Sequence, residues 1–202
     1  MKDFKSVVTE ANVCLKNYGF KKHKHTFFVK KDNNWGLINF QKSNIEGSSQ
    51  FTINLGVVSG ALRDFIQGEK LLDTPDLTEC HWSKRIGELL PEGVEYWWQI
   101  QSTESFGALV NEINEVLQSI AIAEIHQNIT DEMLLQQWIK GSSPGITEYQ
   151  RLEYLAILLK FYADDRFQIA AENLIAFCNG KSIASGAKEI LRLLEQPDSF
   201  SK

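Results

Sequence analysis

The chain has 202 residues, of which 43% are hydrophobic and 23% are charged, as in an ordinary globular protein. Its three cysteines, Cys14, Cys80 and Cys178, are far apart and form no CxxC pair, which favours free thiols in a reducing compartment over a disulfide framework. No stretch approaches the roughly 18 consecutive apolar residues of a transmembrane helix, and the N-terminus lacks the apolar run of a secretory signal. We therefore expect a cytoplasmic protein without membrane contact.

The net charge of −5 is distributed unevenly along the chain. Residues 1–100 carry 13 Lys and Arg against 12 Asp and Glu, whereas residues 101–202 carry 8 against 14. General nucleic-acid binding depends on cationic contacts to phosphates, so an acidic second half argues against it.

The first half of the chain begins with an amphipathic helix and continues with strands. Apolar residues recur at helical spacing from Phe4 to Tyr18, which predicts a helix over residues 3–18 that ends before Gly19. Segments rich in β-formers and separated by turn residues then predict an antiparallel meander followed by two more strands. The five expected strands are residues 26–31, 36–43, 50–58, 81–89 and 96–101, with a short helix near 60–67.

From Ser105 onward the apolar residues follow the 3.6-residue period of a helix. A helix is predicted over residues 105–120, and it should pack on the same face of the sheet as the first helix. The remaining helices are expected at residues 130–141, 147–162, 165–178 and 182–195. We therefore predict an α+β fold, with an α+β domain at residues 1–127 and an all-helical C-terminal region at residues 128–202.

Alternation along the strands gives the predicted sheet two unlike faces. The first face is apolar and comprises Phe27, Val29, Ile38, Phe40, Phe51, Ile53, Leu55, Val57, Trp82, Ile86, Tyr96, Trp98 and Ile100. The second face carries amides, hydroxyls, aromatic rings and two cations but no carboxylate, and it comprises Thr26, Phe28, Lys30, Asn39, Gln41, Thr52, Asn54, His81, Ser83, Arg85, Trp97, Gln99 and Gln101.

Three interpretations of this polar face are open. It could simply face water, as one side of an antiparallel sheet commonly does, or the C-terminal helices could cover it. The third interpretation is a binding surface formed by Gln41, Asn54, Arg85 and Trp97. Amides offer paired donors and acceptors, a tryptophan offers a flat anchor, and an arginine offers a planar fork. The expected partner is a protein or a small polar ligand.

No motif in the sequence is specific for an enzyme or a cofactor. The sequence contains no Walker loop, GxGxxG, HExxH or GxSxG, and we expect no cofactor. His23 and His25 could share one side of an extended segment, but no third ligand is near in sequence, so we expect no metal. An enzymatic alternative would use His81, Arg85 and Trp97 on the polar face of the sheet.

The first 31 residues are basic, with 8 lysines against two acidic residues. This segment supports a further alternative, nucleic-acid contact through phosphates, with Phe28 and Trp35 available to stack on bases. Lysines that protect an edge strand from aggregation explain the same residues, and we expect the partner not to be a nucleic acid.

The chain contains, in this order, YGFKKHKHTFF, INFQKS, FTINLGV, HWSKRIGEL and YWWQI. This succession resembles the bacterial family called domain of unknown function 4304, over roughly residues 3–120. The resemblance implies an α+β domain without an established activity, so no catalytic residue is carried over. The sequence thus predicts a non-catalytic binding or interaction protein, immunity-like by analogy with small bacterial families that neutralise toxins.

Overall fold

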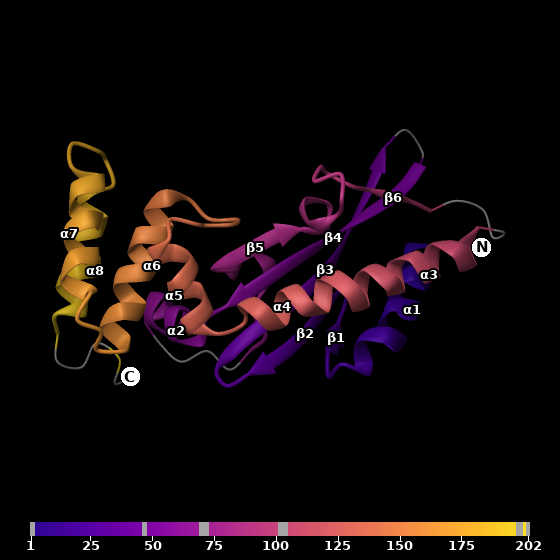
Figure 1. The fold of residues 1–202 in the computed structure, drawn as a ribbon, viewed down its shortest axis with the longest axis horizontal. Coiled ribbons are helices and arrows are strands. Elements are labelled where there is room, and N and C mark those ends of the chain that lie inside the picture. The colour runs from indigo at the N-terminus through magenta and orange to yellow at the C-terminus, as the bar shows by residue number, and fades with distance from the viewer. Residues whose placement is uncertain (1–2, 46–47, 69–72, 101–104, 197–199, 201–202) are drawn as a thin grey trace.

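The computed structural model describes residues 3–45, 48–68, 73–100, 105–196 and 200. It confirms the predicted α+β fold: an antiparallel sheet carries helices on one face, and a group of helices lies at one end (Figure 1). No helix in the described ranges is both long and apolar enough to cross a bilayer.

Helix α1 (Phe4–Lys16) lies within the predicted range. Asp3 caps its first turn, because its carboxylate accepts the Ser6 backbone N–H at 2.9 Å. The apolar stripe of the helix is buried, whereas Tyr18, the last residue of the predicted stripe, lies beyond the helix and is 43% exposed.

In the described part of the chain the sheet contains six strands, one more than predicted. They are β1 (Lys21–His23), β2 (Thr26–Lys31), β3 (Asn34–Ile45), β4 (Ser48–Val58), β5 (Trp82–Arg85) and β6 (Trp98–Gln99). The order is β1-β2-β3-β4-β5, every pairing is antiparallel, and β6 pairs with β4 on the same edge as β5. The extra strand is β1, which lies in the basic segment and turns into β2 at Lys24, whose φ is 53°.

Two predicted strands are too long. The strand expected at 81–89 ends at Arg85, because the Arg85 backbone N–H donates to Glu88 at 2.7 Å and a 3₁₀-helix, η2 (Ile86–Leu89), follows. Gly87 then packs against the returning chain, where a Cβ would lie 2.2 Å from the Val94 carbonyl oxygen. Of the strand expected at 96–101 only β6 remains, and Gln101 lies outside the described residues.

One continuous helical segment crosses the apolar face of the sheet (Figure 1). It consists of α3 (Phe106–Val116), the π-helical turn η3 (Leu117–Ala121) and α4 (Ile122–Asn128), so it runs eight residues past its predicted end at 120. Helix α1 contacts both α3 and β4, and the Phe4 ring lies 6.0 Å from that of Phe51. Both helices therefore cover the predicted face.

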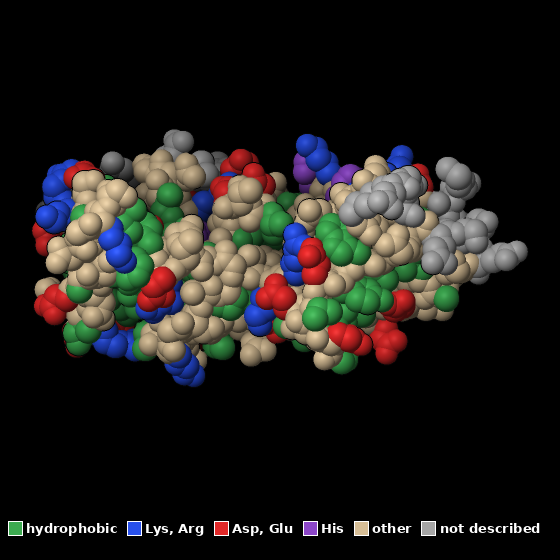
Figure 2. All heavy atoms as spheres, turned by 90° about the horizontal axis from the view of Figure 1, so that it is seen from above, with side chains coloured by type: hydrophobic (Ala, Val, Ile, Leu, Met, Phe, Trp, Pro, Cys, Tyr) green, Lys and Arg blue, Asp and Glu red, His purple; other side chains and the backbone are tan. Residues whose placement is uncertain are grey.

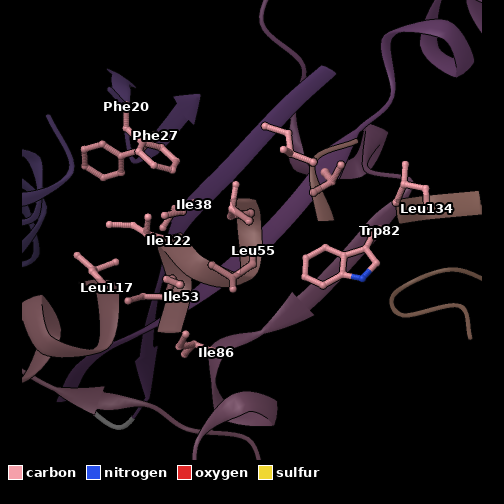
Figure 3. Close-up of a cluster of buried hydrophobic side chains, with 14 of the residues drawn as sticks. Phe20, Phe27, Ile38, Ile53, Leu55, Trp82, Ile86, Leu117, Ile122 and Leu134 are labelled. Atoms are coloured by element: carbon pink, nitrogen blue, oxygen red, sulfur yellow. The ribbon is translucent and has the colours of Figure 1, made fainter. Parts of the chain in front are cut away.

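The predicted apolar face forms the main core (Figure 3). All its predicted members belong to one buried cluster or pack against it. Phe40, Ile53, Trp98 and Ile113 are each at most 3% exposed and share this cluster.

The C-terminal region is helical as predicted. Its helices are α5 (Asp131–Ile139), α6 (Glu148–Phe161), α7 (Phe167–Cys178) and α8 (Ala184–Leu194). The main core continues into α5 and α6 through Leu134, Trp138 and Ile157, while α7 and α8 pack on α6 around a second, smaller cluster. The division at residue 127 stays a prediction, and one buried cluster spans both sides of it.

Candidate functional site

The face predicted to be polar carries polar side chains along only half the length of the strands. Thr26, Asn39, Asn54 and Arg85 lie opposite one another across four strands. The neighbouring rows toward β6 pair Gln41 with Thr52 and Gln50 with Gln99. In the other direction the face becomes apolar, with a buried cluster of Phe28, Leu37 and Val58.

The segment that follows β4 lies over this apolar half. It contains α2 (Gly60–Gln67) and the 3₁₀-helix η1 (Leu77–Glu79). A Cβ on Gly56 would lie 2.3 Å from the Cys80 sulfur, so the missing side chain leaves room for this segment.

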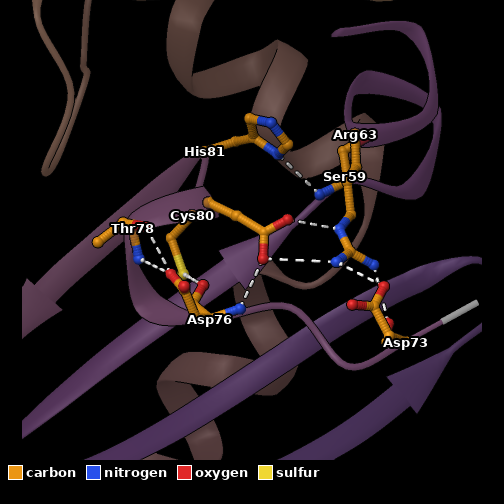
Figure 4. A network of polar contacts seen from close by, with 8 residues as sticks. Ser59, Arg63, Asp73, Asp76, Thr78, Cys80 and His81 are labelled. Carbon is orange, nitrogen blue, oxygen red and sulfur yellow. Dashed lines mark hydrogen bonds and ion pairs between the residues drawn. The ribbon is translucent and has the colours of Figure 1, made fainter. Parts of the chain in front are cut away.

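A buried arginine ties the covering segment together (Figure 4). Arg63 donates to the Glu79 carboxylate at 2.8 Å and to the backbone carbonyl of Asp73 at 2.8 Å. Burial alone would lower the pKa of Arg63, but the Glu79 and Asp73 carboxylates raise it. The guanidinium is therefore a structural cation and not a free group on the polar face.

Linked amides occupy the polar half of the face. Asn39 donates to the Thr26 hydroxyl at 2.8 Å, and Asn54 donates to the Gln41 side-chain oxygen at 3.0 Å. Asn54 is only 6% exposed, whereas Gln41 is exposed and its NH₂ group makes no hydrogen bond within the described part of the chain. Thr52, opposite Gln41, is fully buried, and its hydroxyl has no hydrogen-bond partner among the residues that the structure describes. We call Thr26, Asn39, Gln41 and Asn54 the amide row.

Beside the amide row, Arg85 and Trp97 contact each other. The guanidinium carbon lies 5.8 Å from the indole ring centroid, in cation–π range. Glu95 joins the two residues, because it pairs with Arg85 and accepts the Trp97 indole N–H at 3.0 Å. Arg85 is 40% exposed and Glu95 is 57% exposed, so this cluster is accessible to solvent.

The structure thus brings together the four residues predicted for binding. Gln41 contacts Asn54, Arg85 contacts Trp97, and Asn54 and Arg85 are opposite each other on neighbouring strands. Sequence reasoning missed Glu95, which supplies a carboxylate to a face predicted to have none. The only local signal is its position two residues before Trp97, on the same side of an extended segment.

His81 lies apart from Arg85 and Trp97. It is four residues, or roughly 13 Å, from Arg85 along the strand. Its Nδ1 accepts the Ser59 backbone N–H at 3.0 Å, and its ring lies edge-on to Tyr154 with centroids 4.9 Å apart. Burial, followed by the charge of Arg63, lowers the pKa of His81 to about 3, so the imidazole is neutral at pH 7.

The C-terminal region covers one end of the polar face. Tyr154 of α6 lies against His81, and the Ser83 backbone N–H donates to the Pro144 carbonyl at 3.1 Å. Figure 1 shows α5–α8 at this end of the sheet, far from β6. The covered-face interpretation therefore applies to His81 and Ser83, and the amide row lies toward the other end.

The N-terminal histidines are exposed on and after β1. The His25 ring lies 4.8 Å from that of Phe4. Across the described ranges, no group of three or more His, Cys, Asp and Glu side chains is placed to hold a metal ion.

Comparison with known proteins gives one match. A family model described as Domain of unknown function (DUF4304) matches residues 11–150, more than two thirds of the chain. This chain belongs to that family. The resemblance seen in the sequence is confirmed, and the DUF4304 match extends beyond residue 120 to include α5 and the start of α6. No curated protein and no solved structure matches the chain.

Proposed function

We propose that this DUF4304 chain is a non-catalytic binding protein whose contact surface is the amide row together with Arg85 and Trp97. The observation that supports this function is the combination of preformed neutral hydrogen bonds with a partly exposed arginine–tryptophan pair on one stretch of sheet. The partner is a protein segment or a small polar ligand.

The chemistry of the surface favours binding without a large desolvation cost. Neutral amides lose less free energy than charged groups when a partner removes their water. Within the described residues the Gln41 NH₂ group donates to no acceptor, and Arg85 has donors beyond the one that pairs with Glu95. A carbonyl or anionic group of the partner would meet Arg85, and Trp97 would anchor an apolar part at small entropic cost.

The enzymatic alternative has less support. His81, its expected acid or base, has Nδ1 occupied and lies behind Tyr154. General acid–base catalysis requires a group within hydrogen-bond reach of the substrate and a pKa near the working pH.

Affinity capture with matched baits tests the proposal. The baits are the wild-type chain, the double variant Arg85→Ala/Trp97→Ala, and the control Tyr18→Ala, which removes an exposed aromatic ring just after α1. We expect a partner whose recovery falls about tenfold on the double variant and stays unchanged on the control. In direct titration each single substitution should then weaken binding by more than about 1 kcal/mol, as interface residues that matter do.

A partner that binds all three baits equally would refute this surface as the binding site. The narrower immunity-like role predicts that the partner is a toxin encoded by a neighbouring gene. A toxin of that kind is therefore the first purified protein to titrate.

A further inference from the structure

A cleft lies at the far end of β3 from the amide row. It has a volume of about 670 Å³ and is situated between the β2–β3 turn, the start of α5 and the end of α6. This volume is within the range of sites that bind small molecules. Its wall includes Asp32, Asp131, Glu132, Tyr162 and Asp164.

Asp131 is a buried carboxylate whose partners are all neutral. It is 7% exposed, and its two oxygens accept from the Asn34 amide at 2.9 Å and the Tyr162 hydroxyl at 2.8 Å. Among the described residues no Lys, Arg or His forms an ion pair with it. A buried charge without a counter-ion is costly, and the N-terminal dipole of α5 offsets only part of that cost.

The rest of the cleft adds negative charge. Among the described residues four carboxylates line it, from Asp32, Asp131, Glu132 and Asp164, against the single cation Arg166. Arg166 is already bound to Asp164, with nitrogen–oxygen distances of 2.8 and 2.5 Å, and these hydrogen bonds lower the pKa of Asp164 to about 2. The cleft therefore has a negative potential that no lining cation is free to balance.

Apolar and aromatic side chains lie beside these carboxylates. Ile139 is 44% exposed, Phe161 41% and Tyr162 53%, although all three are large hydrophobic residues. Burial, together with the neighbouring Asp131 carboxylate, raises the pKa of the Tyr162 hydroxyl, which therefore remains a donor. An ammonium or guanidinium group is attracted to both carboxylates and aromatic faces, and its alkyl stem is compatible with apolar walls.

We propose that this cleft binds an organic cation, with an alkylammonium or guanidinium head directed at Asp131 and Glu132 and an apolar stem along Ile139 and Phe161. A metal ion fits less well, because the described residues contain no group of three His, Cys, Asp or Glu side chains placed for one. The site is separate from the amide row and does not depend on the function proposed there.

NMR titration of the full-length labelled chain tests the site at low ionic strength. One probe is spermidine and the other is a blocked Ala-Lys-Ala peptide, so that a free amine is distinguished from a basic side chain of a protein. We expect shifts confined to amides near residues 130–136 and 161–166, with a Kd below about 1 mM for at least one probe. The tighter probe identifies the source of the cation.

Three substitutions distinguish binding in the cleft from non-specific attraction of a cation to the acidic chain. Glu132→Gln should weaken binding about threefold and Asp131→Asn about tenfold or more, as removal of exposed and buried charges does. The control Glu115→Gln removes an equal charge from the exposed face of α3 and should leave the Kd within about twofold.

If Asp131→Asn does not fold, the test uses Glu132→Gln and Tyr162→Phe instead. Both side chains are exposed, so these two substitutions should leave the fold intact. Equal weakening by Glu132→Gln and Glu115→Gln would overturn the site. The absence of localised shifts with either probe at about 5 mM would overturn it as well.

Discussion

At the scale of single residues, neighbours in sequence have opposite roles. Trp97 and Trp98 are adjacent, yet Trp98 is 3% exposed, stacks on Phe51 with centroids 5.4 Å apart and donates to Glu112 at 2.7 Å. Trp97 points to the other face, toward Arg85. Strand alternation alone separates a core tryptophan from a candidate contact residue.

This pair supplies a matched prediction. Trp98→Ala should lower the free energy of unfolding by about 3–5 kcal/mol, as the loss of a buried aromatic ring does, whereas Trp97→Ala should cost less than about 1 kcal/mol. Urea denaturation of both variants measures the difference. A cost for Trp97→Ala as large as that for Trp98→Ala would mean that Trp97 is a structural residue.

Ile113 tests the assignment of the apolar face. It is 2% exposed in the main core, so Ile113→Ala should cost about 2–5 kcal/mol. Ile169→Ala, at a position on α7 that is 61% exposed, is the control and should change stability by less than about half a kcal/mol. Similar small losses at both positions would contradict the core described above.

His81 predicts a dependence of stability on pH. Its pKa is about 3 in the folded chain and about 6.5 when unfolded, so between these values only the unfolded state binds the proton. Stability is therefore lost as the pH falls from about 6.5 toward 3, by about 1 kcal/mol per pH unit.

The variant His81→Asn isolates this contribution. An asparagine oxygen can replace Nδ1 as the acceptor for the Ser59 N–H, but it does not titrate. Denaturation between pH 6 and pH 4.5 should show a shallower loss of stability for the variant, while carboxylate titrations are common to both proteins. Parallel curves would show that the imidazole is accessible to protons in the folded state.

At the scale of elements, the segment after β4 decides which part of the polar face is accessible. Arg63 on α2 holds this segment through Asp73 and Glu79, and its side chain is 4% exposed. Arg63→Ala should cost about 1–3 kcal/mol, because the Glu79 carboxylate and the Asp73 carbonyl lose their donors.

Hydrogen exchange checks this prediction locally. Amides near residues 76–81 should exchange faster in Arg63→Ala, whereas those of α7 should not change. Asp73→Asn is the milder comparison, since Asp73 is 75% exposed and its carbonyl remains. Unchanged exchange rates at residues 76–81 would show that Arg63 does not hold this segment in place.

At the scale of the whole molecule, the charged side chains are scattered, whereas most of the buried hydrophobic side chains form one continuous core. On the surface shown in Figure 2, acidic and basic side chains are interspersed and hydrophobic side chains gather between them, without a broad field of one sign. The main core, in contrast, is continuous from α1 to α6 and also includes Ala170 of α7 and Leu194 of α8. Leu134, Trp138 and Ile157 contribute to it from beyond residue 127.

Truncation tests whether residues 1–127 can fold without the part of the core that lies beyond them. A fragment of residues 1–127 removes those side chains and should show no cooperative unfolding transition. Residues 1–163 keep all buried members of the main cluster except Ala170 and Leu194, and should unfold cooperatively at a lower midpoint. Circular dichroism during thermal unfolding measures both. A cooperative transition for residues 1–127 would support the predicted domain boundary.

The sequence by itself determined most of the elements and the two faces of the sheet. Helix periodicity, and caps such as Thr130 and Thr147, act within a few residues, so they place α5 and α6 nearly as observed. Strand alternation likewise assigns Ile53 to the core and Asn54 to the opposite face. These are local properties of the chain, so the sequence contains them directly.

Only the tertiary structure decided which polar residues are accessible and which meet. His81 is hidden by Tyr154, 73 residues later in the chain, and Gly56 is covered by Cys80. The Asp131 cleft depends on Asn34 and Tyr162, which come from β3 and the end of α6. Contacts between distant segments follow from how whole elements pack, and no local pattern in the sequence encodes that packing.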